Sequence, residues 1–184
     1  MTQQKIQKKK IKNQRREKKK YDVEEKINHK VVQITRVSKV VKGGKKLSFR
    51  AIVIVGIEGK HGFVGIGAAK ADDIANAINK AISKGKKNLI QIPITKTETI
   101  PQSTEGVFGA CLVILKPSSP GSGVIAGSSI RTVLEVAGVR NVLAKQIGSN
   151  NLLNSAKATI NGLNKLKTIS QVAKDRNISV DLLY

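Results

Sequence analysis

The sequence predicts an α+β protein with two small folded units, a βββα unit followed by a ββαβα unit. Two strand-like runs rich in β-branched residues flank Gly43 and Gly44, and a stretch with helical spacing follows them. After Pro93 the pattern begins again with two more strand-like runs. We therefore expect a basic arm at 1–27, a first domain at 28–95, a second domain at 96–168 and a short helical tail at 169–184.

The first segment, residues 1–27, carries a dense run of lysine and arginine with few apolar residues to pack. Such composition indicates a disordered arm that becomes ordered on a polyanion. A tail that only keeps the chain soluble is the alternative interpretation. No apolar segment follows the first basic residues, so we expect no secretory signal.

The first domain begins with VVQITRVSKVV, which is typical of a strand. Gly43 and Gly44 then predict a two-residue hairpin turn with positive φ at both positions. The second strand is LSFRAIVIVG, and a third short strand is expected at about Gly62 to Gly67. A helix over 71–88 should cover one face of this sheet with the apolar stripe Ile74, Ile78, Ala81 and Ile82.

The charges at the two ends of this helix match the helix dipole. Asp72 and Asp73 stand near its start, and Lys84, Lys86 and Lys87 stand near its end. We interpret the two aspartates as compensating the dipole rather than as an acid–base pair.

The second domain begins with ETIPQSTEGVFGACLVILKP, which predicts two strands joined by a turn around Glu105 and Gly106. The loop SSPGSGVIAGSS leads into a helix that should end at Gly138, and a strand NVLAKQIG and a second helix NSAKATINGLNKL follow. In the tail, SQVAKDRNISVDLLY suggests one or two helical turns capped by Ser170 and Ser179. The expected apolar stripes are Ile130, Val133, Leu134 and Ala137 on the first helix, and Ala156, Ile160, Leu163 and Leu166 on the second.

The net charge indicates the class of partner. The chain has 34 Lys and Arg against 12 Asp and Glu, a formal charge of +22 on 184 residues, so a polyanion should neutralise it. No apolar run reaches the roughly 20 residues that span a bilayer, and aromatic residues that could anchor in its interface are few, so we expect nucleic acid and no membrane.

The residues offer little for catalysis or metal binding. The single Cys111 excludes an internal disulfide and, with only His29 and His61, excludes an ordinary zinc cluster, so a reducing compartment is indicated. Cys111 lies in the apolar run ACLVIL and should be buried and inert, while both histidines should lie on the surface. We expect no catalytic residue, no metal, no cofactor, no enzymatic activity and no homo-oligomer.

The Gly- and Ser-rich loop PGSGVIAGSS stands before a helix, where backbone N–H groups favour anions. It loosely resembles the phosphate loop of small-molecule kinases related to galactokinase and homoserine kinase, but no Walker lysine follows it and Arg131 is the first charge. Two interpretations remain open: close approach of the backbone to an RNA phosphate or another chain, and tight internal packing.

The basic residues outside the arm form two groups, one around the predicted hairpin and one on the first helix, where Lys80 joins the three lysines at the helix end. So few aromatic residues favour binding to the backbone of folded RNA over stacking on unpaired bases. The predicted RNA-binding residues are Arg36, Lys39, Lys42, Gly43, Gly44, Lys45, Lys46, Arg50, Lys84, Lys86, Lys87 and Arg131.

Two long stretches, RVSKVVKGGKKLSFRAIVIVG and PGSGVIAGSSIRTVLEVAGVRNVLAKQIGSNN, resemble the fifth small-subunit ribosomal protein family of bacteria and plastids. The resemblance covers about residues 28–168 and implies a first domain like double-stranded-RNA-binding domains and a second domain of the fold typical of this family. It implies a structural role at the junction of body and head in the small subunit, where the protein binds small-subunit rRNA and supports decoding accuracy.

The resemblance also implies partners and positions. The partners are the fourth and eighth small-subunit ribosomal proteins, with the path by which messenger RNA enters nearby. Val37, Ser38 and Lys39 match the side of the spectinomycin pocket. Gly109, Cys111 and Leu112 fall in a strand similar to the family's contact with the fourth protein, and because Leu112 stands where a basic residue is common, a salt bridge is not expected there.

The tail is similar to that of plastid and cyanobacterial members, and Lys, Ile and Asn are abundant. This similarity predicts that the chain works in a small ribosomal subunit in the chloroplast (plastid) stroma. The bacterial cytoplasm is the alternative.

Two other functions stay open at the level of sequence. A small-molecule phosphotransferase would use the Gly/Ser-rich loop, and a free RNA chaperone would use the many lysines.

Overall fold

The computed structural model describes residues 27–179, so the predicted basic arm, apart from Ile27, and the last five residues of the tail lie outside the described part. The fold is α+β, as predicted. Its elements are β1 (Ile27–Val41), β2 (Gly44–Ile57), β3 (Phe63–Ala71), α2 (Ile74–Lys87), β4 (Ile90–Gln91), β5 (Thr104–Phe108), β6 (Cys111–Pro117), β7 (Val124–Ile125), α3 (Ser128–Ala137), β8 (Val142–Gly148), α4 (Leu152–Asn164) and α5 (Ile169–Arg176). None of the helices between residues 27 and 179 is long and apolar enough to cross a membrane.

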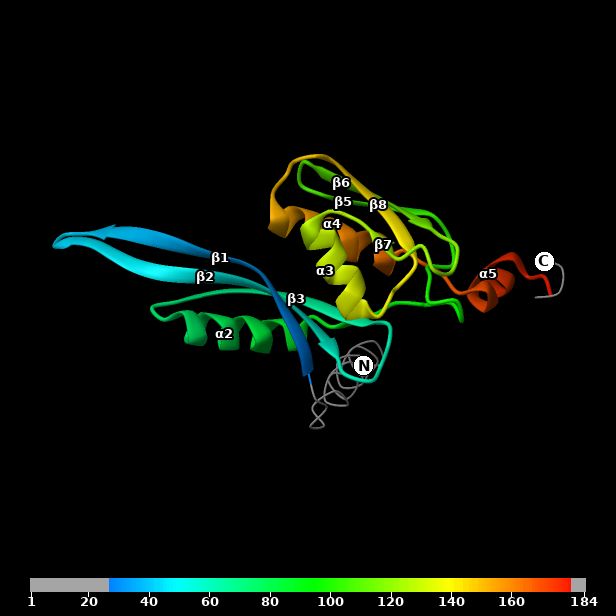
Figure 1. Ribbon diagram of the computed structural model, residues 1–184, viewed down its shortest axis with the longest axis horizontal. Coiled ribbons are helices and arrows are strands. Elements are labelled where there is room, and N and C mark those ends of the chain that lie inside the picture. Colours follow the sequence, from blue (N-terminus) through cyan, green and yellow to red (C-terminus); the bar gives the residue numbers. More distant parts are fainter. Residues whose placement is uncertain (1–26, 180–184) are drawn as a thin grey trace, which may run out of the picture.

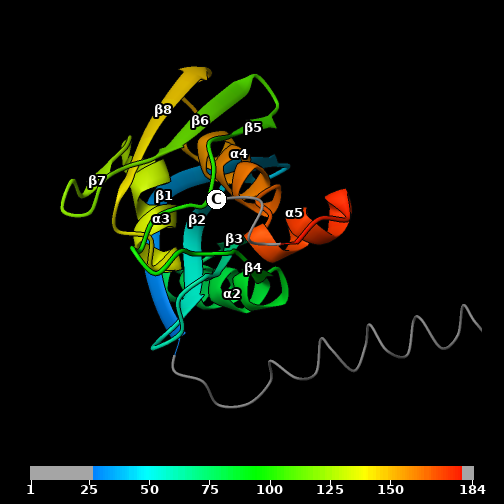
Figure 2. The ribbon, with the colours of Figure 1, turned by 90° about the vertical axis from the view of Figure 1, so that its right-hand side faces the viewer.

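The elements form two sheets. The first sheet has the order β1-β2-β3-β4 and is antiparallel throughout, and the second has the order β5-β6-β8-β7, in which only the pair β7 and β8 is parallel. Figure 2 shows the stacking: the second sheet lies above α3 and α4, these lie above the first sheet, and α2 closes the stack below.

The first sheet is therefore covered on both faces, which explains the continuous apolar run in β2. Every residue from 51 to 57 is buried. Val53 and Val55 pack with residues of α2, whereas Ile54 belongs to the larger cluster that includes α3. A strand buried on both faces needs no polar alternation. The larger of the two clusters thus spans both predicted domains, while the smaller lies between the first sheet and α2.

Glycine permits very close contact between strand and helix in both halves of the molecule. A Cβ atom on Gly67 of β3 would overlap the Ala81 carbonyl oxygen and lie 2.8 Å from the Gly85 backbone nitrogen of α2. In the second sheet, a Cβ on Gly106 would lie 2.6 Å from the backbone nitrogen of Gly162 in α4. Both helices rest almost directly on the strand backbone, so neither strand position accepts a side chain.

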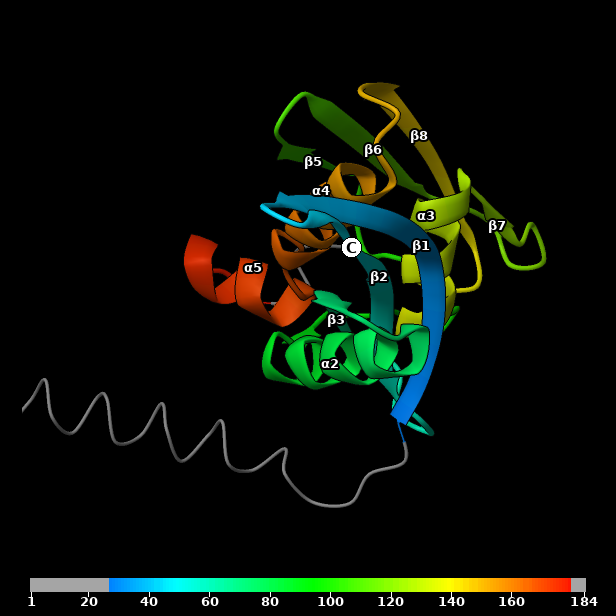
Figure 3. The same ribbon diagram turned by 90° about the vertical axis from the view of Figure 1, so that its left-hand side faces the viewer.

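The hairpin of β1 and β2 extends beyond the rest of the fold (Figure 1). It curves strongly along its length (Figure 3), and a register shift between Val31 and Gln33 lies in β1, where a bulge increases bending and twist. The predicted turn is present but its geometry is not the predicted one. Val41 pairs with Gly44, so the loop residues are Lys42 and Gly43, and positive φ occurs only at Gly44 (132°).

Several boundaries differ from the sequence expectations. The third strand, β3, is longer than predicted and continues to Ala71. The turn after β5 lies at Gly109 and Ala110, not around Glu105 and Gly106, because those two residues pair within the β5–β6 ladder. The loop before α3 contains the unpredicted short strand β7, which pairs with β8.

The predicted stripe of α2 is partly wrong. Ile74 is 43% exposed, and the fully buried positions are the small residues Ala77, Ala81 and Gly85. The helix lies so close to β3 that only small side chains fit between them. Ile78 and Ile82, which were also predicted, pack at the edge of this contact.

The helices of the second half follow the sequence closely. All four predicted stripe residues of α3 are buried, and Gly138 caps its C-terminus with φ of 84°. In α4 the predicted stripe is buried except Ile160, which is half-buried, and Leu166 lies just beyond the helix end. In the tail, α5 begins after Thr168, whose side chain and that of Gln171 form a capping box. The prediction of Ser170 as the cap was therefore wrong, and the turn predicted after Ser179 falls outside the described residues.

Candidate nucleic-acid interface

The hairpin tip presents cations on both faces. Lys39 pairs with Lys46 and Val40 pairs with Lys45 across the ladder, and residues opposite each other share a face. Because faces alternate along a strand, Lys39 and Lys46 lie on one side and Lys45 on the other. The predicted RNA-binding residues from 36 to 46 are all exposed. Arg50, nearer the body of the sheet, is half-buried.

The two glycines of the tip leave open space around the backbone. A Cβ atom on Gly43 or Gly44 would meet nothing within 4 Å. Gly44 is required for its positive φ rather than for internal packing. An external partner can therefore approach the backbone of this turn closely.

The lysines of α2 form the second basic group. Lys80, Lys86 and Lys87 are exposed, and the Lys84 ammonium donates a hydrogen bond of 3.2 Å to the backbone carbonyl of Ala68. Lys84, Lys86 and Lys87 lie in the last turn, where positive charge interacts favourably with the helix dipole.

The Asp72 carboxylate interacts with a lysine from each of the two basic groups. One oxygen of its carboxylate lies 3.3 Å from Nζ of Lys46, and the other accepts a hydrogen bond of 3.2 Å from the Ser48 hydroxyl. The Lys46 ammonium is the main reason that the pKa of the Asp72 carboxyl is lowered, and Lys80 contributes. Asp72 therefore positions a hairpin lysine in addition to standing near a helix start, and Asp73, the N-cap residue, makes no side-chain capping bond.

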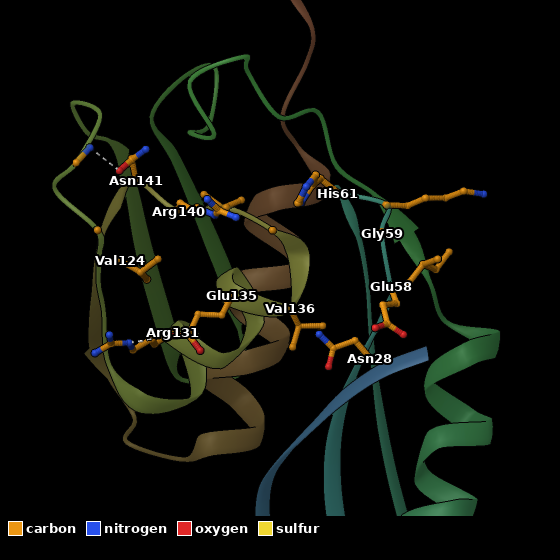
Figure 4. Close-up of a pocket in the computed structure, with 16 residues that line it drawn as sticks. Asn28, Glu58, Gly59, His61, Val124, Arg131, Glu135, Val136, Arg140 and Asn141 are labelled. Carbon is orange, nitrogen blue, oxygen red and sulfur yellow. Dashed lines mark hydrogen bonds and ion pairs between the residues drawn. The ribbon is translucent and has the colours of Figure 1, made fainter. Parts of the chain in front are cut away.

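A cavity of about 560 Å³ lies between the two halves of the fold (Figure 4). Glu135 of α3 accepts hydrogen bonds from Lys30 of β1 at 2.7 Å and from Nε of Arg131 at 2.9 Å. The bond from Lys30 is the main reason that the pKa of the Glu135 carboxyl is lowered, with Arg131 adding to the effect. The guanidinium of Arg131, a predicted RNA-binding residue, is thus partly engaged within the protein.

The titratable side chains of this cavity include one histidine and two carboxylates. His61 packs against the C-cap Gly138, Glu135 is held in ion pairs, and Glu58 is exposed at the cavity wall. His29 and His61 are exposed, as predicted. Within residues 27–179, no group of three or more His, Cys, Asp or Glu side chains could hold a metal ion.

The Gly/Ser-rich loop is open rather than tightly packed. A Cβ on Gly121 or Gly123 would meet nothing within 4 Å, and both residues have positive φ (90° and 74°). Internal packing, one of the two interpretations of this loop, is therefore wrong for these two glycines. Asn141 anchors the loop by accepting a hydrogen bond of 3.0 Å from the Gly121 backbone N–H.

The outer face of the second sheet, which faces away from α4, carries a row of apolar residues at one end. Val107, Leu112 and Ile147 lie side by side across β5, β6 and β8. Val107 and Ile147 are 54% and 49% exposed, and Leu112 is half-buried. Gly109 is exposed at the turn, whereas Cys111 points to the opposite face and is fully buried, with its Sγ 3.4 Å from the Ser155 hydroxyl oxygen. Of these positions, the Cys111 side chain cannot reach a partner.

The sequence indicated the basic groups of the hairpin and of α2, but not that the two groups come close together in the fold. Lys70 had no distinguishing pattern, because it stands alone among alanines near the end of β3. Its proximity to the hairpin depends on the register of β2 with β3, in which Arg50 pairs with Lys70. That register is a long-range property.

Comparison with known proteins matches both halves of the chain to one family. The model of the ribosomal protein S5 N-terminal domain matches residues 27–93, and that of the S5 C-terminal domain matches residues 106–176. Small ribosomal subunit protein uS5c of Trieres chinensis is 61% identical over 155 residues, covering 84% of this chain and 83% of the relative. Small ribosomal subunit protein uS5 of Nostoc punctiforme is 60% identical over 154 residues, covering 84% and 87%. The uS5c protein of Cyanophora paradoxa is 60% identical over 148 residues, covering 80% and 86%.

Proposed function

The chain belongs to the ribosomal protein S5 family, and from this premise we propose how it works as a structural, non-enzymatic constituent of the small ribosomal subunit that binds rRNA and other ribosomal proteins. Membership of this family removes the reason to propose a phosphotransferase. The resemblance of the Gly/Ser-rich loop to the phosphate loop of small-molecule kinases then reflects a fold that the two families share.

The observation that carries the proposal is the hairpin tip. Lysines on both faces of a narrow two-stranded projection, with an open glycine turn between them, suit insertion between RNA backbones. Each lysine near a phosphate releases condensed counterions and strengthens binding at low salt. We propose that the tip, residues 36–50, contacts small-subunit rRNA at the junction of body and head, with Val37, Ser38 and Lys39 beside the spectinomycin pocket. The path of messenger RNA into the subunit lies nearby, and decoding accuracy depends on this placement.

The outer face of the second sheet is proposed to contact a neighbouring ribosomal protein. Exposed apolar residues that lie next to each other, here Val107, Leu112 and Ile147, are typical of protein interfaces. The fourth small-subunit protein is the proposed partner at Gly109 and Leu112, and the eighth is the proposed second neighbour.

The proposed location is the small subunit of a plastid ribosome, in the stroma. The relatives that support it are the uS5c proteins, and cyanobacterial uS5 proteins of similar identity keep a bacterial cytoplasm as the alternative. In either case the chain acts in a ribosome of the bacterial type.

Sedimentation tests this function. A tagged copy of the full chain, expressed in a cyanobacterium, is expected to migrate with small subunits through a sucrose gradient at physiological salt. Migration as free protein would contradict the proposal. Free protein that also anneals or unwinds RNA duplexes would instead support a separate RNA chaperone.

A further inference from the structure

A second cavity, of about 370 Å³, lies at the base of the hairpin. Its walls come from β1, β2, the end of β3 and α2, and they include Ser38, Lys39, Ser48, Lys70, Asp72 and Lys80. We refer to it as the hairpin-base cavity. Its lining residues Lys70 and Ala71 stand at the end of β3, beyond which β1 and β2 continue outward (Figure 1).

The charge in the hairpin-base cavity is strongly positive. Lys39, Lys70 and Lys80 line it against the single carboxylate of Asp72. Both oxygens of that carboxylate are already engaged, one with Lys46 and one with Ser48. The three lining lysines form no ion pair with any residue between 27 and 179.

The register explains why Lys39 and Lys70 lie on one face of the sheet. Arg50 of β2 pairs with Lys70 on one side and with Thr35 on the other, and two residues further along β1 stand Val37 and then Lys39 on the same face. Lys80 reaches the same place from α2, since its charge acts on the Asp72 carboxyl. Three separate elements, β1, β3 and α2, thus each contribute a lysine to the lining of one hollow.

A phosphodiester fits this arrangement better than a carboxylate side chain would. Lysine binds phosphate as a point charge and needs no fixed planar geometry. The hollow is also continuous with the hairpin through Lys39 and Lys46, so an RNA strand held at the tip passes close to it.

We propose that the hairpin-base cavity is a second phosphate-binding site for the rRNA backbone, formed by Lys39, Lys70 and Lys80, in which the Asp72 carboxylate, paired with Lys46, is the one opposing charge. This inference rests on the proposed rRNA-binding function and adds two contact residues: Lys70, which no sequence pattern singled out, and Lys80, which belongs to the basic group of α2 but not to the predicted RNA-binding residues. The RNA strand is then held at two places, at the tip and at the base of the hairpin.

Amine-specific acetylation tests the contact directly. The full chain is acetylated alone and in complex with a transcript of Nostoc punctiforme small-subunit rRNA, and each lysine is read by mass spectrometry. Lys70 and Lys80 are expected to react severalfold less in the complex, while Lys174 of α5, exposed and outside the cavity, keeps its reactivity. If the RNA binds but Lys70 and Lys80 react as in the free chain, the cavity is not a phosphate site. If the RNA does not bind at all, the proposed function fails instead.

A second arm separates RNA from free anions. Inorganic phosphate, added without RNA at matched ionic strength, is expected to leave Lys70 and Lys80 reactive. Protection by inorganic phosphate as complete as that by the transcript would overturn the assignment to RNA.

Substitutions at the cavity are expected to change RNA affinity in opposite directions, according to the charge that each one removes. Lys70→Ala and Lys80→Ala are each expected to weaken binding to the transcript about 5- to 8-fold at 0.1 M salt. Each phosphate contact contributes about 0.7 to 0.9 to the slope of log affinity against log salt, and the contribution is counted over the tenfold fall in salt from 1 M to 0.1 M. Asp72→Asn removes the opposing charge and frees Lys46, so it should tighten binding, on the order of 5-fold. The exposed Lys174→Ala variant should change little. Weaker binding by Asp72→Asn, or equal losses in Lys70→Ala and Lys174→Ala, would contradict the proposal.

Discussion

Replacing Lys42, Lys45 and Lys46 together by alanine is expected to weaken binding to small-subunit rRNA by roughly 100- to 500-fold at 0.1 M salt. Three phosphate contacts are lost, each worth about 0.7 to 0.9 in the slope of log affinity against log salt. The slope itself should therefore fall by about 2 to 3. Filter binding or fluorescence anisotropy over a series of salt concentrations measures both quantities.

The fold should survive this triple change. All three side chains are exposed at the tip, and in the described residues their one ion pair, between Lys46 and Asp72, is exposed on both sides. Exposed pairs contribute about 0 to 1 kcal/mol. An unchanged denaturation midpoint would confirm that the loss of affinity comes from lost contacts.

A matched control removes three exposed lysines elsewhere, at 116, 145 and 174, and changes the net charge equally. This control should lower affinity far less than the hairpin variant. Equal losses from both variants would mean that the chain binds RNA through its total charge, without a defined interface.

Gly67→Ala is expected to destabilise the protein by about 3 kcal/mol or more, through forced separation of β3 and α2. The added methyl group would overlap the Ala81 carbonyl oxygen and lie 2.8 Å from the Gly85 nitrogen. Both atoms belong to the helix backbone, so no side-chain rotation relieves the overlap. Chemical denaturation of the full chain measures the loss in free energy of unfolding, which for a typical domain is only about 5 to 15 kcal/mol in total.

Gly43→Ala is the matched control for this substitution. Gly43 lies in the hairpin turn without positive φ, and an added methyl group there would meet nothing within 4 Å. The free energy of unfolding of the Gly43→Ala variant should change by no more than about 0.5 kcal/mol. If Gly67→Ala were as harmless as Gly43→Ala, the close contact between β3 and α2 would be contradicted.

The local signals in the sequence predicted the elements of the fold well. The spacing of Ile130, Val133 and Leu134, followed by Gly138, predicts both the buried face and the end of α3, because periodicity and a C-cap residue are properties of adjacent positions. The same holds for β8 and for the existence of the β1–β2 hairpin.

Long-range packing could not be predicted from the same signals. In α2, the isoleucine at 74 and the alanine at 77 both suit a helical stripe, and only the distance to β3 decides that the small residue is buried. The covering of the first sheet by α3 depends on a helix that belongs to the second half of the chain, after all four strands of that sheet. The candidate site shows the same division: the charge of the tip was evident from the sequence, whereas the role of Lys70 depends on strand register.

A density map of small ribosomal subunits that contain this chain tests the central claim most directly. We predict the hairpin turn at Lys42 and Gly43 enclosed by rRNA, with the ammonium groups of Lys42, Lys45 and Lys46 within hydrogen-bonding distance of phosphate oxygens. Subunits that lack the chain, or a map with the hairpin tip in solvent, would contradict the account.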